Sequence, residues 1–433
     1  MGKIAFLGAG STIFAKNVLG DCLLTPSLRE SELALFDVDA GRLKDSALML
    51  ETINRNVNRS RARITAYADR RKALSGAAYV VNAVQIGGYE PCTVTDFEIP
   101  KKYGLRQTIG DTIGIGGIFR ALRTIPVVFD FARDMEDACP DALFLNYVNP
   151  MAMITGAVLR HTAVRTVGLC HSIQVCVPHL FRELGMDLAG VRWKIAGINH
   201  MAWLLEVAKD GIDLYPGIKE RAGKRPTPHN DMVRYEIMRR FGYYVTESSE
   251  HSAEYTPWFI KTGYPQLIGR FEIPLDEYPR RCVQQIEEWK RMRARLVENR
   301  DLGHERSDEY ASHVMEAVET GTPHTIGGNV LNRGLITNLP EEACVEVPCL
   351  VDGNGVSPCR VGALPAQLAA LNMTNINVQL LTIEAAVTRK RDFVYQAALL
   401  DPHTSAELSI DDIVALCDEL IEAHGSWLPR FRS

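Results

Sequence analysis

The sequence predicts an α/β protein with an N-terminal doubly wound parallel sheet and a C-terminal α+β domain. Two observations support this prediction. Apolar strand segments alternate with helical segments through the first half of the chain, and a glycine-rich turn directly follows the first strand. The second half is less regular. We therefore expect two domains, residues 1–195 and 196–433, and the 46% hydrophobic residues suffice for a core in each.

The glycine-rich turn is typical of a dinucleotide-binding domain. Gly8 and Gly10 follow an apolar strand and permit close backbone approach, and Ser11 and Thr12 begin a helix expected to end at residue 24. The free N–H groups of that helix would face a pyrophosphate. This arrangement predicts a Rossmann-type fold, although Ile13 replaces the third glycine of the usual fingerprint.

Carboxylates after the second strand indicate which dinucleotide binds. That strand, residues 32–37, ends in Asp37, where the ribose-binding acid of such domains is expected. A carboxylate there favours NAD over NADP, because it would repel a 2′-phosphate. We also assign cofactor binding to Asp39 and to Gln85, which opens a loop expected to overhang the nicotinamide. The alternative is an ordinary strand–turn–helix without a nucleotide.

The remaining elements follow in order. We expect a helix at residues 42–58, strands at 63–67, 77–84, 142–148, 164–169 and 193–198, and helices at 275–299, 375–389 and 410–424. Because the early strands alternate with helices, they should run parallel, with the ligand at their carboxyl ends.

Two polar residues are expected to face that ligand. Asp111 lies in a stretch, residues 109–117, that contains four glycines, and we interpret the stretch as a mobile lid. A plain flexible connection is the alternative. Asn149 precedes Pro150 at the end of the 142–148 strand, in a turn that resembles the one in lactate and malate dehydrogenases. Asn149 is expected to bind a substrate hydroxyl, with helix capping as the alternative.

Composition excludes several classes of protein. The net charge of −5 and pI near 6.2 argue against a protein that binds nucleic acid or a membrane surface. We find no apolar run of membrane-spanning length and no export signal, and ten cysteines are scattered without framework spacing. We therefore expect a cytoplasmic protein with free thiols.

Cys170 and His200 suggest a metal site. Each follows an apolar strand, so a thiolate and an imidazole would meet at the sheet edge, with the substrate completing the coordination shell. The alternatives are a buried thiol and a core histidine with satisfied hydrogen bonds.

Several motifs together resemble glycoside hydrolase family 4, over essentially the whole chain. They are Gly8–Thr12, Gln85–Cys92, Asn146–Pro150, Gly168–Ser172, Gly197–Met201 and Glu247–Trp258. The resemblance implies a glycosidase that uses tightly bound NAD and a divalent metal, normally Mn²⁺, and not the usual pair of carboxylates. It also implies oxidation of the sugar at carbon 3, loss of the carbon-2 proton, elimination of the aglycone, water addition and re-reduction.

The resemblance also implies roles for individual residues. Cys170 and His200 match the metal ligands, and Tyr255 matches the base that takes the carbon-2 proton. His171 stands where other members carry an aspartate that protonates the leaving oxygen. Asn149 and Asp111 are expected to bind the substrate. His251 supports the site or contacts the sugar.

The resemblance favours an unphosphorylated substrate. Phospho-sugar members carry an arginine shortly after the paired glycines of the fourth-strand loop, whereas here no basic residue stands between Gly88 and Lys101. The triplet at residues 170–172 matches α-galactosidase members. We expect a small-molecule α-galactoside substrate and a homodimer or homotetramer. The alternatives are another α-glycosidase of the family (α-glucosidase or α-uronidase), a metal-independent 2-hydroxy acid dehydrogenase and an NAD(H)-sensing module.

Overall fold

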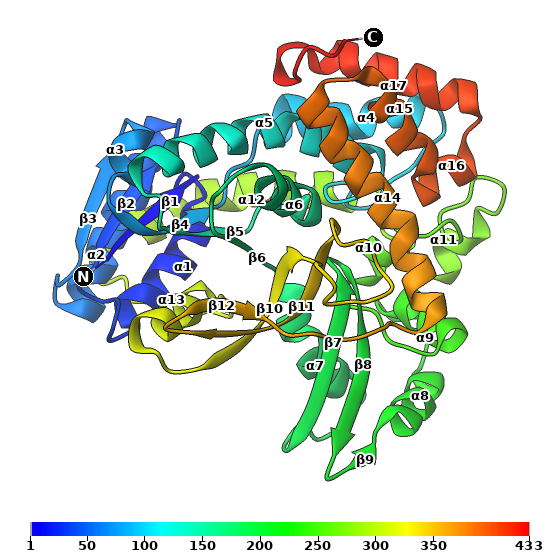
Figure 1. Ribbon diagram of the computed structural model, residues 1–433, viewed down its shortest axis with the longest axis horizontal. Helices are drawn as coiled ribbons and strands as arrows, with labels where there is room; N and C mark the ends of the chain where they lie inside the picture. The colour runs from blue at the N-terminus through cyan, green and yellow to red at the C-terminus, as the bar shows by residue number, and fades with distance from the viewer. Residues whose placement is uncertain (1, 433) are drawn as a thin grey trace.

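A computed structural model describes residues 2–432, and one continuous sheet runs through both halves of the chain (Figure 1). Its N-terminal part has the strand order β3-β2-β1-β4-β5-β6, all parallel. These strands are β1 (Lys3–Leu7), β2 (Glu32–Phe36), β3 (Arg63–Tyr67), β4 (Ala77–Asn82), β5 (Leu143–Asn146) and β6 (Thr166–Leu169). This is the order of a doubly wound dinucleotide-binding fold, as the alternating pattern predicts.

An antiparallel extension continues the sheet beyond β6 in the order β10-β11-β7-β8-β9, with β12 paired to β11. The strands are β7 (Val191–Ile198), β8 (Met201–Lys209), β9 (Ile212–Asp213), β10 (His324–Leu331), β11 (Cys344–Asp352) and β12 (Gly355–Pro358). Strands from late in the chain thus lie between β6 and β7. A boundary at residue 195 stays a prediction, because the hydrogen-bonded sheet does not divide there.

Helices cover the sheet and build a separate layer near the C-terminus (Figure 1). In the first half they are α1 (Thr12–Leu24), α2 (Ala40–Asn58), α3 (Arg70–Leu74), η1 (Gly88–Thr93), α4 (Val94–Lys102), α5 (Gly114–Ala138), α6 (Met151–His161) and α7 (His171–Glu183). In the second half they are α8 (Tyr215–Lys224), α9 (Met232–Phe241), α10 (Ser249–Glu254), α11 (Gln266–Arg270), α12 (Glu277–Arg293), η2 (Ala294–Glu298), α13 (Ala311–Thr320), α14 (Ala366–Thr388), α15 (Arg391–Leu400), α16 (Pro402–Glu407), α17 (Ile410–His424) and η3 (Gly425–Trp427). Helix α14 packs on α5 and α6, and α17 packs on α4 and α15. Over residues 2–432, none of the helices has the length and apolar character needed to cross a membrane.

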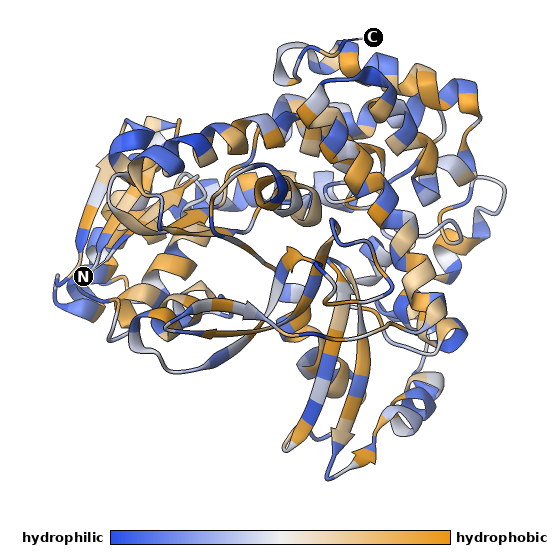
Figure 2. Cartoon of the chain, viewed as in Figure 1, coloured by the Kyte–Doolittle hydropathy of each residue, from blue (hydrophilic) through white to orange (hydrophobic). Residues whose placement is uncertain are grey.

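The central parallel strands are buried on both faces, which explains their nearly continuous apolar sequences, whereas the edge strand β3 has no buried residue. Residues 4–7 of β1 and 79–82 of β4 are all buried, and Figure 2 shows these strands as predominantly hydrophobic. The β7–β8 hairpin instead carries hydrophilic and hydrophobic bands in turn (Figure 2). A smaller core packs α7 and α8 against that hairpin, with Leu204 and Tyr244 among its buried members.

Most expected elements are confirmed, with shifts at their ends. Strand β3 and helix α17 have the expected bounds, and β4 ends at Asn82, two residues before the expected end. The helix expected at residues 375–389 is the second part of the longer α14, and the one expected at 275–299 is divided into α12 and η2.

The expectation of a mobile lid at residues 109–117 is wrong, because the whole stretch is buried. The carboxylate of Glu254 accepts hydrogen bonds from the backbone amides of Thr108, Ile109 and Gly110 at 2.8 to 3.3 Å. A Cβ atom on Gly116 would lie 2.3 Å from the Gly110 carbonyl oxygen. The glycines therefore serve close packing at the start of α5, and not flexibility.

Candidate functional site

The glycine-rich turn predicted to bind a nucleotide lies where β1, β2 and β4 end. Gly8 has φ +90°, and a Cβ on it would lie 2.7 Å from the Ala83 carbonyl group. The Gly10 amide donates to Asp37 Oδ2 at 2.7 Å, and a Cβ on Gly10 would lie 2.8 Å from that oxygen. Both glycines are therefore needed for the backbone to pass this close to its neighbours. Asp37 lies directly against the turn, as the sequence predicts.

The other predicted cofactor residues surround this turn. Ser11 is the exposed N-cap residue of α1, and Thr12 is buried in its first turn. Asp39 Oδ1 caps α2 by accepting hydrogen bonds from two of its first amides, at 2.9 and 3.0 Å. Gln85 is exposed, three residues after β4 ends. A cofactor contact for each of these four residues stays a prediction.

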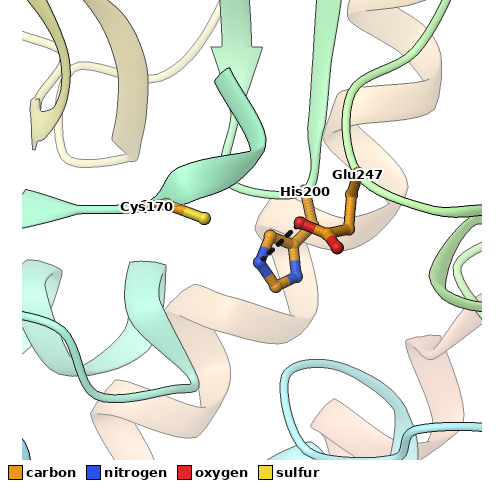
Figure 3. A group of neighbouring side chains, drawn as sticks. All are labelled: Cys170, His200 and Glu247. Atoms are coloured by element: carbon orange, nitrogen blue, oxygen red, sulfur yellow. Dashed lines mark ion pairs between the residues drawn. The ribbon is translucent and has the colours of Figure 1, made fainter. Parts of the chain in front are cut away.

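The thiol of Cys170 and the imidazole of His200 converge with a carboxylate, that of Glu247 (Figure 3). Cys170 follows β6, and His200 lies in the tight turn between β7 and β8. One ligand atom from each of the three residues lies within 4.8 Å of the others, and His200 Nε2 is 3.4 Å from Glu247 Oε2. His200 (φ 63°) and Glu247 (φ 69°) both have left-handed backbone conformations, which are rare for side chains of this kind.

The charges of this cluster suit a divalent cation. Burial raises the pKa of the Cys170 thiol, so the isolated site favours the neutral form. Burial also opposes ionisation of Glu247, but His200 and His251 outweigh it and hold the pKa of that carboxyl below its ordinary value. Sulfur, nitrogen and oxygen ligands that converge from separate elements fit a transition metal.

Tyr255 contacts the same imidazole from its other side. Its hydroxyl lies 2.9 Å from His200 Nδ1, and its side chain is buried. Burial, with Asp111 and Glu254 nearby, raises the pKa of this phenol well above its ordinary value. Since one nitrogen of His200 faces Tyr255 and the other faces Glu247, this imidazole joins the ligand cluster to the phenol.

Asp111, Asn149 and His251 form a second wall of the site, next to His200. Asn149 Nδ2 donates to Asp111 Oδ2 at 3.5 Å, and His251 Nε2 is 4.0 Å from Asp111 Oδ1. The ring centroids of His251 and His200 are 4.7 Å apart. Burial opposes the ionisation of Asp111, but Arg120 and His251 hold its pKa below the ordinary value. Arg120 also donates to the Asn149 carbonyl at 3.2 Å.

His171 begins α7, next to Cys170 in the chain, and pairs with a second buried carboxylate. Its Nε2 lies 2.9 Å from Glu309 Oε1, and this hydrogen bond raises the pKa of the imidazole above its ordinary value. The side chain of His171 is 42% exposed, so it stays accessible from solvent. The next residue, Tyr310, accepts a hydrogen bond from the Cys170 amide at 2.7 Å and so fixes the backbone of that cysteine.

The structure thus brings together all the residues that the sequence predicts for metal binding, catalysis and substrate binding. Sequence reasoning missed Glu247, Glu309 and Arg120 as members of the site. Glu247 lies in a quoted motif, but nothing local distinguishes it from Glu250 three residues later. Glu309 and Arg120 reach the site from segments far from Cys170 in the sequence, so only the fold could reveal them.

Comparisons with known proteins indicate the family of this chain. Residues 3–186 match the description "Family 4 glycosyl hydrolase", and residues 195–404 match "Family 4 glycosyl hydrolase C-terminal domain". The chain is 65% identical to an α-galactosidase of Bacillus subtilis, covering 100% of both chains. It is 36% identical to an α-galactosidase of Rhizobium meliloti, covering 99% of this chain and 89% of the relative.

A solved structure has the same fold. The 6-phospho-β-glucosidase of Thermotoga maritima, solved with manganese, NAD⁺ and glucose 6-phosphate, superposes with a TM-score of 0.81 at 22% identity, covering 99% of this chain and 100% of the other. The two family descriptions together cover most of the chain, and the relatives cover nearly all of it. The chain therefore belongs to family 4 of the glycosyl hydrolases and is a glycoside hydrolase.

Proposed function

We propose that this glycoside hydrolase is an α-galactosidase that acts on terminal, unphosphorylated α-D-galactosides of the melibiose type. The 65% identity to a relative named as an α-galactosidase supports the sugar specificity. The observation that carries the chemistry is the convergence of Cys170, His200 and Glu247 beside Tyr255, within reach of a dinucleotide-binding sheet.

Gly8, Gly10 and Asp37 would hold NAD, since the turn leads directly into the N-terminus of α1, which suits a pyrophosphate, and Asp37 sets a carboxylate beside it for the ribose. When bound, NAD supplies a hydride acceptor for carbon 3 of the sugar and later returns the hydride, so no net NADH accumulates. The solved relative that contains NAD⁺ supports this assignment.

Cys170, His200 and Glu247 would hold Mn²⁺ or another divalent metal. A bound metal supplies Lewis-acid stabilisation of negative charge on the sugar oxygens at carbons 2 and 3. Cys170 must lose its proton for this, because the thiolate is the ligand. Glu247 adds a negative charge and leaves an edge of the cluster for substrate oxygens.

Tyr255 takes the proton from carbon 2. Its buried surroundings raise the pKa of the phenol, so it needs a partner that favours the phenolate. His200 provides this partner. Because its Nε2 is directed to the ligand cluster, its Nδ1 carries the hydrogen and donates a hydrogen bond to the Tyr255 oxygen, 2.9 Å away. The same imidazole thus orients the base.

His171 donates a proton to the leaving oxygen. The 2.9 Å contact between Nε2 and Glu309 fixes the imidazole ring and leaves Nδ1 as its free edge. On the other wall, Asp111 and Asn149 bind sugar hydroxyls, and His251 supports Asp111. Arg120 does not make this wall a phosphate site, because Asp111 balances its charge and its N–H groups donate to the Asn149 carbonyl and to Tyr278.

A single assay tests this proposal. The protein is stripped with a chelator, and release of nitrophenol from nitrophenyl α-galactoside is measured with and without NAD, Mn²⁺ and a thiol reductant. We expect hydrolysis only when all three are present, with no net NADH. Nitrophenyl α-glucoside and an α-galacturonide serve as comparison substrates. Steady NADH formation from a small hydroxy acid, without hydrolysis, would instead indicate a dehydrogenase.

A further inference from the structure

A cavity of about 580 Å³, lined by both polar and apolar groups, opens beside the metal-ligand cluster. Its walls come from α7, from the residues before and at the start of α9, from the residues around the start of α10, and from residues 272–274. His171 and Glu247 both line it, so the cavity begins where the proposed proton donor and a proposed metal ligand lie. A leaving group that receives a proton from His171 would therefore lie next to this cavity.

The lining favours a ligand rich in hydroxyl groups. His179, His229 and Asn230 line the cavity and carry side chains that can form hydrogen bonds, and Val175 and Pro228 add small apolar surfaces. The Nδ1 atoms of His179 and His229 already contact Arg182 and the Asp231 amide, at 2.7 and 3.1 Å. Over residues 2–432, the cavity lining contains imidazoles but no phenyl, phenol or indole ring. Recognition here must therefore rest on hydrogen bonds to hydroxyls and not on stacking against an aromatic platform.

The charges of the lining disfavour an anionic ligand. Three glutamates, Glu247, Glu250 and Glu272, face the cavity, and Glu272 is exposed. Arg234 is the one arginine or lysine side chain of the lining in the described chain, and it is buried and ion-paired with Asp231. A phosphate or carboxylate on the ligand would meet these carboxylates, and the two cationic groups of the lining, Arg234 and His171, are each paired with a carboxylate of the protein.

We infer that this cavity receives a neutral sugar as the leaving group, and that His229 and Asn230 determine specificity for it. The inference rests on the proposed function, because it takes His171 as the proton donor and the metal cluster as the binding site of the galactosyl ring. The volume, about 580 Å³, lies within the range of roughly 300–1,000 Å³ typical of small-molecule pockets.

Two substrates with the same galactosyl group test the inference. One is the α-1,6-linked disaccharide of galactose and glucose, and the other is α-galactosyl fluoride, whose leaving group is a single atom. We expect His229→Ala and Asn230→Ala to lower the ratio of kcat/KM for the disaccharide to kcat/KM for the fluoride by about fivefold or more, as the loss of one or two hydrogen bonds implies. His313→Ala, a change on α13 outside the cavity lining, is the matched control and should leave the ratio unchanged.

A charge change provides a second, independent readout. Glu272 is exposed, so Glu272→Arg carries little risk to folding. This variant should shift the preference between leaving groups from glucose toward glucuronic acid, by about tenfold in the ratio of kcat/KM values.

The outcomes separate the two proposals. If wild type cleaves both substrates but neither the alanine variants nor Glu272→Arg moves its ratio, the cavity does not bind the leaving group and the inference is wrong. If wild type cleaves neither galactoside, the proposed function fails, and the inference fails with it.

Discussion

Cys170 is a residue whose protonation state depends on what it binds. Burial keeps its thiol neutral, so the thiolate forms only when a cation compensates its charge. We expect Cys170→Ser to abolish metal-dependent hydrolysis and to weaken Mn²⁺ binding strongly, while NAD binding changes little. Calorimetric titration with each ligand and the nitrophenyl galactoside assay measure these effects. Cys359→Ser is the control, because Cys359 is an exposed free cysteine; full activity of Cys170→Ser would refute the metal assignment.

The proposed base at Tyr255 gives a second prediction at this scale. Tyr255→Phe keeps the ring but removes the oxygen that lies 2.9 Å from His200 Nδ1. Activity should fall by roughly 10²- to 10⁴-fold, the usual effect of losing a general base. In D₂O, the rate at which deuterium enters carbon 2 of the released galactose should fall in parallel.

Tyr264→Phe, at an exposed position, is the matched control for that experiment. Mn²⁺ binding by the Tyr255→Phe variant should persist, because Tyr255 belongs to no part of the ligand cluster. Undiminished deuterium incorporation in this variant would rule out Tyr255 as the base.

At the scale of elements, Glu254 joins α10 to the buried segment before α5. Its carboxylate accepts from three successive backbone amides, yet burial raises its pKa to about 7. Glu254→Gln should lower the free energy of unfolding by about 1–3 kcal/mol, because an amide group cannot accept from all three donors. Hydrogen exchange at residues 108–117 should become faster. The control is Glu287→Gln at an exposed position of α12.

The same residue predicts a pH dependence. The pKa of Glu254 is higher in the folded state than in the unfolded chain, so proton binding favours the fold. This contribution is fully present below the ordinary glutamate pKa of about 4.5 and is lost as the pH rises through 7. Urea unfolding of wild type should therefore show a larger stability decrease over this range than Glu254→Gln, which keeps the contribution of Glu346, whose pKa burial also raises to about 7. Parallel curves for the two proteins would contradict the prediction.

The parallel half of the fold could be predicted from sequence, because each element there carries its own signal. Buried parallel strands are short apolar runs, and the glycines and Asp37 mark the turns between strand and helix. The order of the antiparallel strands could not be predicted, since β10 and β11 pair with strands far away in the sequence. The mobile lid was an error of the same kind: the partner that fixes residues 108–110, Glu254, lies more than a hundred positions away.

The candidate site was predictable to a similar extent. Cys170 and His200 follow recognisable strands, whereas the third member of their cluster, Glu247, follows none. Glutamates are common on surfaces, so a sequence pattern cannot single out the one whose carboxylate turns inward. The left-handed backbone at Glu247 helps to position its side chain. Such a conformation is usually signalled by a glycine in the sequence, and here the residue is a glutamate.

At the scale of the whole molecule, a buried ion pair joins early and late parts of the chain. Asp96 on α4 binds Arg123 on α5 through two contacts, of 2.6 and 3.2 Å, and His424 at the end of α17 at 2.8 Å. Asp96→Asn leaves the Arg123 guanidinium buried without a charged partner. We expect a loss of about 3–5 kcal/mol in the free energy of unfolding, measured with urea.

Asp130→Asn is the control for this change, because Asp130 forms an exposed ion pair whose loss should cost less than about 0.5 kcal/mol. Equal stability of the two variants would show that the buried network does not hold α17 in place. The expected homodimer or homotetramer remains a prediction at this scale, and light scattering of the purified protein would measure it.

Because the sheet combines strands from both parts of the chain, metal binding by the ligand cluster depends on the association of these parts. Cys170 belongs to residues 1–195, whereas His200 and Glu247 belong to residues 196–433, and β10 from the later segment pairs directly with β6 from the earlier one. Two polypeptides produced separately and divided before β7, residues 1–190 and 191–433, would each hold an incomplete ligand set. Tight binding of Mn²⁺ would then be observed only after the two fragments are mixed. It would show that β6 and β10 have paired again.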